Sequence, residues 1–151
     1  MKHKNTLIAI AILFAASGLL AADKIAAQQV AEEVAAAHPE ITSLEIAASK
    51  SQSEGCKTIA ATEAKEVGQK CDKDELTAIK TNAPFAEKEK DGFDVTLPLH
   101  DSSGKVMGTA GMDFKPEPGQ TKSDVVGKAK LIASELEKRL TSKEQLFERA
   151  K

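Results

Sequence analysis

The stretch from Phe93 to Phe114 places the strongest constraint on the fold, because it has the pattern of a β-hairpin. Apolar and polar residues alternate along its two arms, as they do in a strand with one buried face. The apolar positions are Phe93, Val95, Leu97 and Leu99 in the first arm, and Val106, Ala110, Met112 and Phe114 in the second. Between the arms, the segment Asp101–Gly104 offers an Asp that can bond the backbone ahead of it and a Gly suited to positive φ. The sequence therefore predicts a sheet organised around this hairpin.

The register of the hairpin follows from the length of its loop. A loop of four residues, Asp101–Gly104, would pair Leu99 with Val106 and Phe93 with Met112, so that apolar residues share a face. With a loop of three residues, the apolar residues of the first arm would instead pair with the mixed-face residues of the second arm, because a slip of one residue exchanges the two faces of a strand. We therefore expect the four-residue loop and this register.

The second face of the hairpin has a mixed composition. Its residues are Thr96, Pro98, Met107, Thr109, Gly111 and Asp113. Apolar area with a few placed polar groups is typical of the wall of a small-molecule pocket. A half-exposed sheet face has a similar composition, so both interpretations fit. Pro98 cannot donate a ladder hydrogen bond, which favours an edge strand or a bulge.

Length and charge bound the class of protein. The chain has 151 residues, with 21 basic and 23 acidic side chains and a formal net charge of −2, and we expect one domain. Because no basic block stands out, there is no electrostatic case for nucleic-acid binding. Five Phe and no Tyr or Trp leave little from which to build a base-stacking platform or a cage for a quaternary ammonium group.

Residues 1–22 have the organisation of an export signal. A basic start at Lys2 and Lys4 precedes the apolar or small run Leu7–Leu20, and Ala21 and Ala22 provide small residues for cleavage. This run is shorter than the ~20 apolar residues of a membrane span, although an uncleaved anchor is the alternative. We expect cleavage after Ala22, or alternatively after Ala21, and a periplasmic or secreted protein with no stable membrane span.

The two cysteines take their meaning from this predicted export. In an oxidising compartment Cys56 and Cys71 are expected to form one disulfide, which would close a loop of about 15 residues and add roughly 3 kcal/mol of stability. The sequence has no C-x-x-C pair of the thioredoxin type. A zinc site would need further ligands, and only His38 and His100 follow the signal. We therefore expect no metal and no other cofactor.

The remaining segments predict an α+β fold. The expected helices are Asp23–Ala37, a short one capped by Asp72 or Asp74 in the connector after the second strand, and one from Ser123 or Asp124 to about Leu140; the expected strands besides the hairpin are Ile41–Ala48, Cys56–Ala61 and Phe85–Lys90. Asp23 is a plausible N-cap of the first helix. The domain would span residues 23–114, followed by a Pro/Gly spacer at 115–122 and a C-terminal helix and tail at 123–151. We expect the tail from Thr141 to dock loosely.

Three short motifs stand at defined places in this order of elements. They are His38-Pro39 before the first strand, Thr58–Thr62 followed by Val67–Lys70, and Pro98–Asp101 followed by Gly104–Gly108. With these motifs the region from about Asp23 to Phe114 resembles the Cache (PDC-type, PAS-like) extracytoplasmic sensor domains. The resemblance implies an antiparallel sheet of about five strands, with the N-terminal helix on one face. It also implies a small organic ligand, often a carboxylate or an amino acid, on the other face.

The same resemblance implies a set of ligand-contacting residues. The candidates are Thr96, Met107, Thr109, Asp113, His100 and Lys57. Asp113 would bind an amine, whereas Lys57 or His100 would reach a carboxylate, and the connector Thr62–Phe85 would cover the ligand. The chain lacks the aromatic and Arg residues of the amino-acid-binding subgroup, which leaves the class of the ligand open.

The chain is expected to consist of this sensor-like domain without an output module. Family members are usually joined through a membrane helix to a kinase, chemoreceptor or cyclase module, whereas this chain ends after one helix. We therefore expect an exported small-molecule-binding domain, sensory or carrier, without its own output module, that works with a membrane receptor or a homodimer partner. A structural or protein-interaction module is the alternative. An enzyme or a redox role of the disulfide is less expected, because neither His lies in a catalytic motif.

Overall fold

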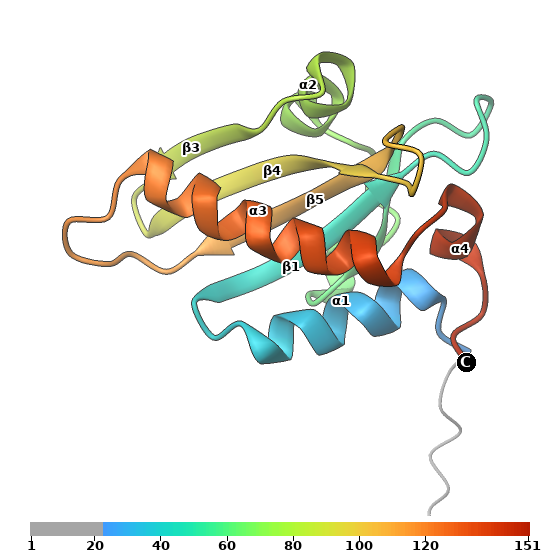
Figure 1. Ribbon diagram of the computed structural model, residues 1–151, viewed down its shortest axis with the longest axis horizontal. Coiled ribbons are helices and arrows are strands. Elements are labelled where there is room, and N and C mark those ends of the chain that lie inside the picture. Colours follow the sequence, from blue (N-terminus) through green and yellow to red (C-terminus); the bar gives the residue numbers. More distant parts are fainter. Residues whose placement is uncertain (1–22) are drawn as a thin grey trace, which may run out of the picture.

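A computed structural model describes residues 23–151 and has an α+β fold (Figure 1). Five strands form one antiparallel sheet in the order β2-β1-β5-β4-β3. They are β1 Ile41–Ala48, β2 Lys57–Ala61, β3 Phe85–Glu89, β4 Gly92–His100 and β5 Val106–Phe114. The helices are α1 Ala26–Ala37, the 3₁₀ turn η1 Ala64–Glu66, α2 Lys73–Thr81, α3 Lys122–Arg139 and α4 Lys143–Phe147. The expected sheet and its helices are therefore confirmed, while the predicted signal peptide lies outside the described residues.

The apolar face of the sheet carries the main core. α1 and α3 lie next to each other over this face, with α4 at the end where the C-terminus lies (Figure 1). The alternation of the strands points Leu44, Val95 and Met112 into this layer, where they are at most 1% exposed. α3 contributes an apolar stripe of fully or almost fully buried residues: Val125, Ala129, Ile132, Ala133 and Leu136.

The second face is covered by the connector between β2 and β3. α2 packs against β4 and β5. Thr96 of β4 and Thr109 of β5 point away from the main core, yet they are only 4% and 0% exposed. The second face of the hairpin is therefore a buried surface at this end, where α2 lies over it.

The hairpin register differs from the expected one by two residues. Phe93 pairs with Phe114 and Leu99 with Gly108, so the pairing of Phe93 with Met112 was wrong. The N–H of Asp101 donates to the carbonyl of Lys105 at 2.9 Å, which leaves a loop of three residues. A β-bulge next to Leu99 then adds one residue to β5 and restores the apolar phase.

The helices α2, α3 and α4 each begin after a short polar residue whose side chain caps the helix: Asp72, Thr121 and Ser142. Asp72 accepts hydrogen bonds from the backbone of α2 and forms a capping box with Glu75, as expected. α3 begins one residue earlier than expected: Thr121 is its N-cap, and Asp124 is the capping-box partner inside the first turn. Asp124 therefore stabilises the start of α3 without being the cap.

The segment before α1 is hydrogen-bonded to the C-terminal tail, and the expectations about Asp23 and about the tail were both wrong. Asp23 does not cap α1. The N-cap residue of α1 is Ile25, and no side chain accepts a capping hydrogen bond there. The N–H of Ala26 donates instead to the carbonyl of Glu148 at 2.7 Å. Leu146 of α4 is 0% exposed, so the tail is packed into the core rather than loosely docked. Within residues 23–151, no helix has both the length and the apolar content to cross a membrane.

Candidate functional site

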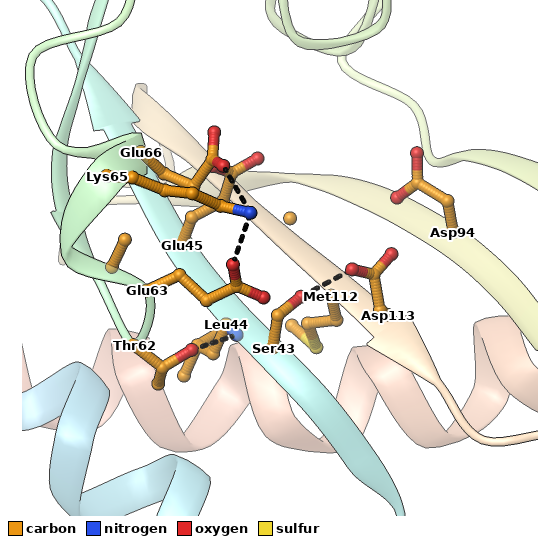
Figure 2. A pocket seen from close by; sticks show the side chains of 12 residues that line it. Ser43, Leu44, Glu45, Thr62, Glu63, Lys65, Glu66, Asp94, Met112 and Asp113 are labelled. Carbon is orange, nitrogen blue, oxygen red and sulfur yellow. Dashed lines mark hydrogen bonds and ion pairs between the residues drawn. The ribbon is translucent and has the colours of Figure 1, made fainter.

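A pocket of about 300 Å³ opens on the second face of the sheet, beside the part that α2 covers (Figure 2). Its volume is at the lower end of the range for small-molecule sites. Three neighbouring strands, β1, β5 and β4, form its floor, and the start of the connector with η1 forms a wall. The lining residues are Ser43, Leu44, Glu45, Ala61, Thr62, Glu63, Lys65, Glu66, Asp94, Gly111, Met112 and Asp113.

A row of acidic residues crosses the floor because the strands set them opposite one another. Ser43 of β1 pairs with Asp113 of β5, Asp113 pairs with Asp94 of β4, and Asp94 pairs with Glu87 of β3. Like charges directly opposite each other destabilise a sheet. The hydroxyl of Ser43 offsets part of this cost by donating a hydrogen bond to Asp113 Oδ2 at 2.6 Å.

Glu45 occupies space that a glycine leaves free. It stands opposite Gly111 in the pairing of β1 with β5. A Cβ atom added at Gly111 would lie 2.8 Å from Oε1 of Glu45 and 2.9 Å from its Cγ. The missing side chain at Gly111 therefore lets Glu45 lie over the sheet inside the pocket.

Lys65, on the wall, is the only basic residue among those that line the pocket. Lys65 Nζ lies 2.9 Å from Glu63 Oε2 and 3.8 Å from Glu66 Oε1, as Figure 2 shows. The wall is tied to β1 by Thr62, whose N–H donates to the carbonyl of Leu44 at 2.9 Å and whose Oγ1 accepts from the N–H of Leu44 at 3.1 Å. Lys65 is thus held by the two carboxylates of its own wall.

The acidic residues of the floor have no such partner. No ion pair within residues 23–151 includes Glu45, Asp94 or Asp113. Burial, followed by the charge of Glu75, raises the pKa of Glu45 to about 7. Burial, followed by the charge of Asp113, raises the pKa of Asp94 to about 7. Near neutral pH both carboxyls are therefore balanced between their charged and neutral forms, and a cation in the pocket would favour the charged form.

Cys56 and Cys71 are joined by the expected disulfide, with Cα atoms 5.3 Å apart. Neither cysteine is among the residues that line the pocket. Within residues 23–151, no group of three or more His, Cys, Asp or Glu side chains has an arrangement suited to a metal ion.

Of the six residues expected to contact a ligand, Asp113 lines the pocket. Thr96 of β4 and Thr109 of β5 are buried, with exposed fractions of 4% and 0%. The expectation that Met107 lies on the second face was wrong: it sits at the bulge of β5, belongs to the main hydrophobic core and is 4% exposed. The Oγ1 of Thr109 has no hydrogen-bond partner among the described residues. These three residues do not border the pocket as it stands.

His100 and Lys57 lie elsewhere. His100 Nδ1 is 2.8 Å from Glu137 Oε1 on α3, and Nε2 is 2.6 Å from Asn82 Oδ1 at the end of α2, so its ring links these two helices. Lys57 is exposed at the start of β2, where it pairs with Lys70. The structure does not bring either residue to the pocket that Asp113 lines.

The sequence prediction missed Glu45 and Asp94. Asp94 alternates in phase with Thr96, so the hairpin pattern would have placed it on the second face. Glu45 is the one charged residue within the strand Ile41–Ala48, which is a signal that was available. Their place in one pocket depends on β5 lying between β1 and β4, and local patterns do not reveal strand order.

No family model matches the sequence, and no curated protein matches it. Solved structures with a similar fold include the second GAF domain of DevS from Mycobacterium smegmatis, with a TM-score of 0.56, 15% identity and coverage of 76% of this chain and 90% of that one. The GAF domain of a two-component sensor histidine kinase from Bacillus halodurans has a TM-score of 0.52 and 9% identity, covering 73% and 92%. A type II free methionine-R-sulfoxide reductase from Thermoplasma acidophilum has a TM-score of 0.52 and 13% identity, covering 83% and 99%.

These similarities establish the fold. The chain shares the PAS-like architecture of these structures, of which two are GAF domains and the third is an enzyme. None of the three is a Cache domain, so the expected resemblance holds for the wider PAS-like group. Identities of 9–15% carry no site residue from these proteins to this chain.

Proposed function

We propose that this protein is a small-molecule-binding domain, sensory or carrier, whose pocket takes a ligand with a positively charged amine. One observation carries the proposal: Glu45, Asp94 and Asp113 share a pocket in which no basic side chain pairs with them. The PAS-like fold, which sensor domains share, supports binding as the role of this face. Within that fold, membership of the Cache branch rests on the hairpin motif Pro98–Asp101 and is part of the proposal.

The electrostatics favour an ammonium or guanidinium group. Half-buried carboxylates pay a desolvation cost that a cation at hydrogen-bond distance offsets. Five carboxylates and one Lys line the pocket, so the interior is acidic unless protons or a ligand neutralise it. Lys65 already pairs with Glu63 and Glu66, so the carboxylates of the floor remain available to bind a cationic ligand.

Export and partners are further parts of the proposal. The pattern of residues 1–22 supports delivery to the periplasm or secretion. There the domain would pass its ligand or its signal to a membrane receptor or to a second copy. Measuring molecular mass against concentration tests the second copy, and a protein that dimerises but binds no small molecule would favour the interaction-module alternative.

The binding proposal is tested with three matched probes: n-butylamine, n-butanol and butyrate. We expect the amine alone to raise the melting temperature at pH 8, since a ligand at about 100 times its Kd adds about 2.7 kcal/mol of stability. Amine affinity should fall as the pH drops through 7, because protons then compete for Glu45 and Asp94.

Variants locate the binding. Asp113→Asn and Asp94→Asn should each weaken the amine at least tenfold, whereas Glu54→Gln, in the exposed loop between β1 and β2, should leave it unchanged. Equal responses to the amine and to butyrate would contradict a cation site. Turnover of free methionine-R-sulfoxide by the reduced protein would replace the proposal with an enzymatic one.

A further inference from the structure

One wall of the pocket belongs to a loop that a disulfide closes. Cys56 and Cys71 are 15 positions apart and covalently joined. Five residues that line the pocket lie between them: Ala61, Thr62, Glu63, Lys65 and Glu66. The covalent closure and the proposed ligand site therefore share one segment of the chain.

Backbone hydrogen bonds hold the base of this loop. The N–H of Thr58 donates to the carbonyl of Gln69 at 2.9 Å, and the N–H of Gly68 donates to the carbonyl of Thr58 at 2.8 Å. Beside the disulfide, the N–H of Cys71 donates to the carbonyl of Cys56 at 3.1 Å. The disulfide thus lies beside a short ladder of backbone hydrogen bonds.

The wall itself has little apolar anchoring. All residues from 62 to 70 are exposed or half-buried, and Val67 is 46% exposed. Thr62 fixes the start of the wall to Leu44 of β1. Segments with few buried apolar contacts and solvent-exposed hydrogen bonds open at low free energy. Covalent closure is therefore expected to contribute much of the order of this wall, by restricting its open states.

The disulfide is also within reach of a reductant. Both cysteines are half-buried rather than part of the core. Exchange with a thiol needs access to one sulfur and a leaving group that is stable as a thiolate. The backbones of Lys57 and Lys70, which neighbour the two cysteines in the sequence, pair beside the disulfide.

We infer that the Cys56–Cys71 disulfide is a redox control on the pocket: its reduction frees the wall and opens the site. A dithiol reductant would supply two electrons and two protons. The S–S bond breaks to give two thiols, while the dithiol is oxidised to its own disulfide. The inference rests on the proposed function only in calling the pocket a ligand site, because the release of the wall is measurable without a ligand.

Hydrogen exchange of the full chain, oxidised and reduced with dithiothreitol, tests the inference. The wall reporters are the amides of Thr58, Thr62 and Gly68, which donate hydrogen bonds within the loop or to β1. The core reporters are the amides of β5. We expect exchange at the wall to accelerate at least tenfold on reduction, with exchange in β5 unchanged. A Cys56→Ser/Cys71→Ser variant should show the fast wall with and without dithiothreitol.

The outcomes separate this inference from the proposed function. Unchanged exchange at the wall would overturn the inference, and so would equal acceleration in β5, which would mark the disulfide as a staple of the whole domain. Binding of n-butylamine is then compared between the two states, and we expect at least tenfold weaker binding after reduction. An oxidised protein that binds no amine, but whose wall is released on reduction, would overturn the proposed function while supporting redox control of this wall.

Discussion

At the scale of single residues, the acidic side chains on the floor of the pocket lower the stability of the sheet. Asp94 and Asp113 stand directly opposite each other, and Glu45 lies over Gly111 within the same pocket. A chain selected for stability alone would place neutral or oppositely charged residues here, because like charges across a ladder are unfavourable. The arrangement is therefore informative about function rather than about folding.

The raised pKa values of Glu45 and Asp94 make a prediction about stability. Each group has a pKa of about 7 in the folded protein, against 4.5 and 3.8 for the free side chains. Between these limits the folded state binds more protons than the unfolded state, so this contribution to the free energy of unfolding falls as pH rises through 7. Glu45→Gln and Asp94→Asn should therefore be more stable than the wild type at pH 8, on the order of 1 kcal/mol each after allowance for solvent screening.

The measurement is chemical denaturation of the wild type and variants at pH 5 and pH 8. At pH 5 the advantage of the two variants should become smaller, because both carboxyls are then neutral in the folded wild type while the unfolded side chains remain largely ionised. Glu54→Gln serves as the exposed control and should follow the wild type at both values. A pH-independent effect of the two pocket variants would show that their charges are not responsible.

At the scale of elements, α4 decides whether the tail belongs to the domain. Leu146 is fully buried although only five residues form the helix around it. The backbone bonds between Ala26 and Glu148 and between Lys24 and Ala150 join this tail to the segment that begins α1. The tail therefore completes the core layer over the apolar face of the sheet.

Truncation of Leu146 tests this role. Leu146→Ala should lower the free energy of unfolding by about 2–5 kcal/mol, as expected for a buried leucine. Leu131→Ala is the matched control: Leu131 lies on α3 but is 74% exposed, so its removal should change stability by less than about 0.5 kcal/mol. Equal effects in the two variants would contradict the packing of α4.

At the scale of the whole molecule, the segment after the expected cleavage site contacts the C-terminal tail. The carboxylate of Asp23 lies 2.9 Å from the guanidinium group of Arg149. Lys24 and Ile25 then pair with the last residues of the chain. A mature protein that starts at Asp23 keeps all of these contacts.

Secretion of the full-length chain from a bacterial host checks this boundary. We expect the intact mass of the exported protein to correspond to residues 23–151, because a basic start, an apolar run and small residues precede Asp23. Replacing Ala22 by a bulky residue should slow processing. An exported protein that retains residues 1–22 would support the uncleaved anchor instead.

The sequence by itself determined which residues share a face and where most elements begin. Alternation is a property of each strand, so Val95 and Leu97 were assigned to the core side without knowledge of their neighbours. The cap at Asp72 is equally local, since it depends on residues within one turn. The pairing of the two cysteines was expected from their number together with the predicted export.

Only the tertiary structure decided what those faces meet. The three-residue loop and one extra residue at the bulge beside Leu99 together set the register of the hairpin, and no local pattern marks the bulge. The pocket formed because β5 lies between β1 and β4, which brought Glu45 close to Asp94 and Asp113 from distant parts of the chain. His100 does not line the pocket, because its ring is hydrogen-bonded to Glu137 of α3 and to Asn82. Periodicity is encoded by neighbours in sequence, whereas these contacts depend on how separate elements pack together.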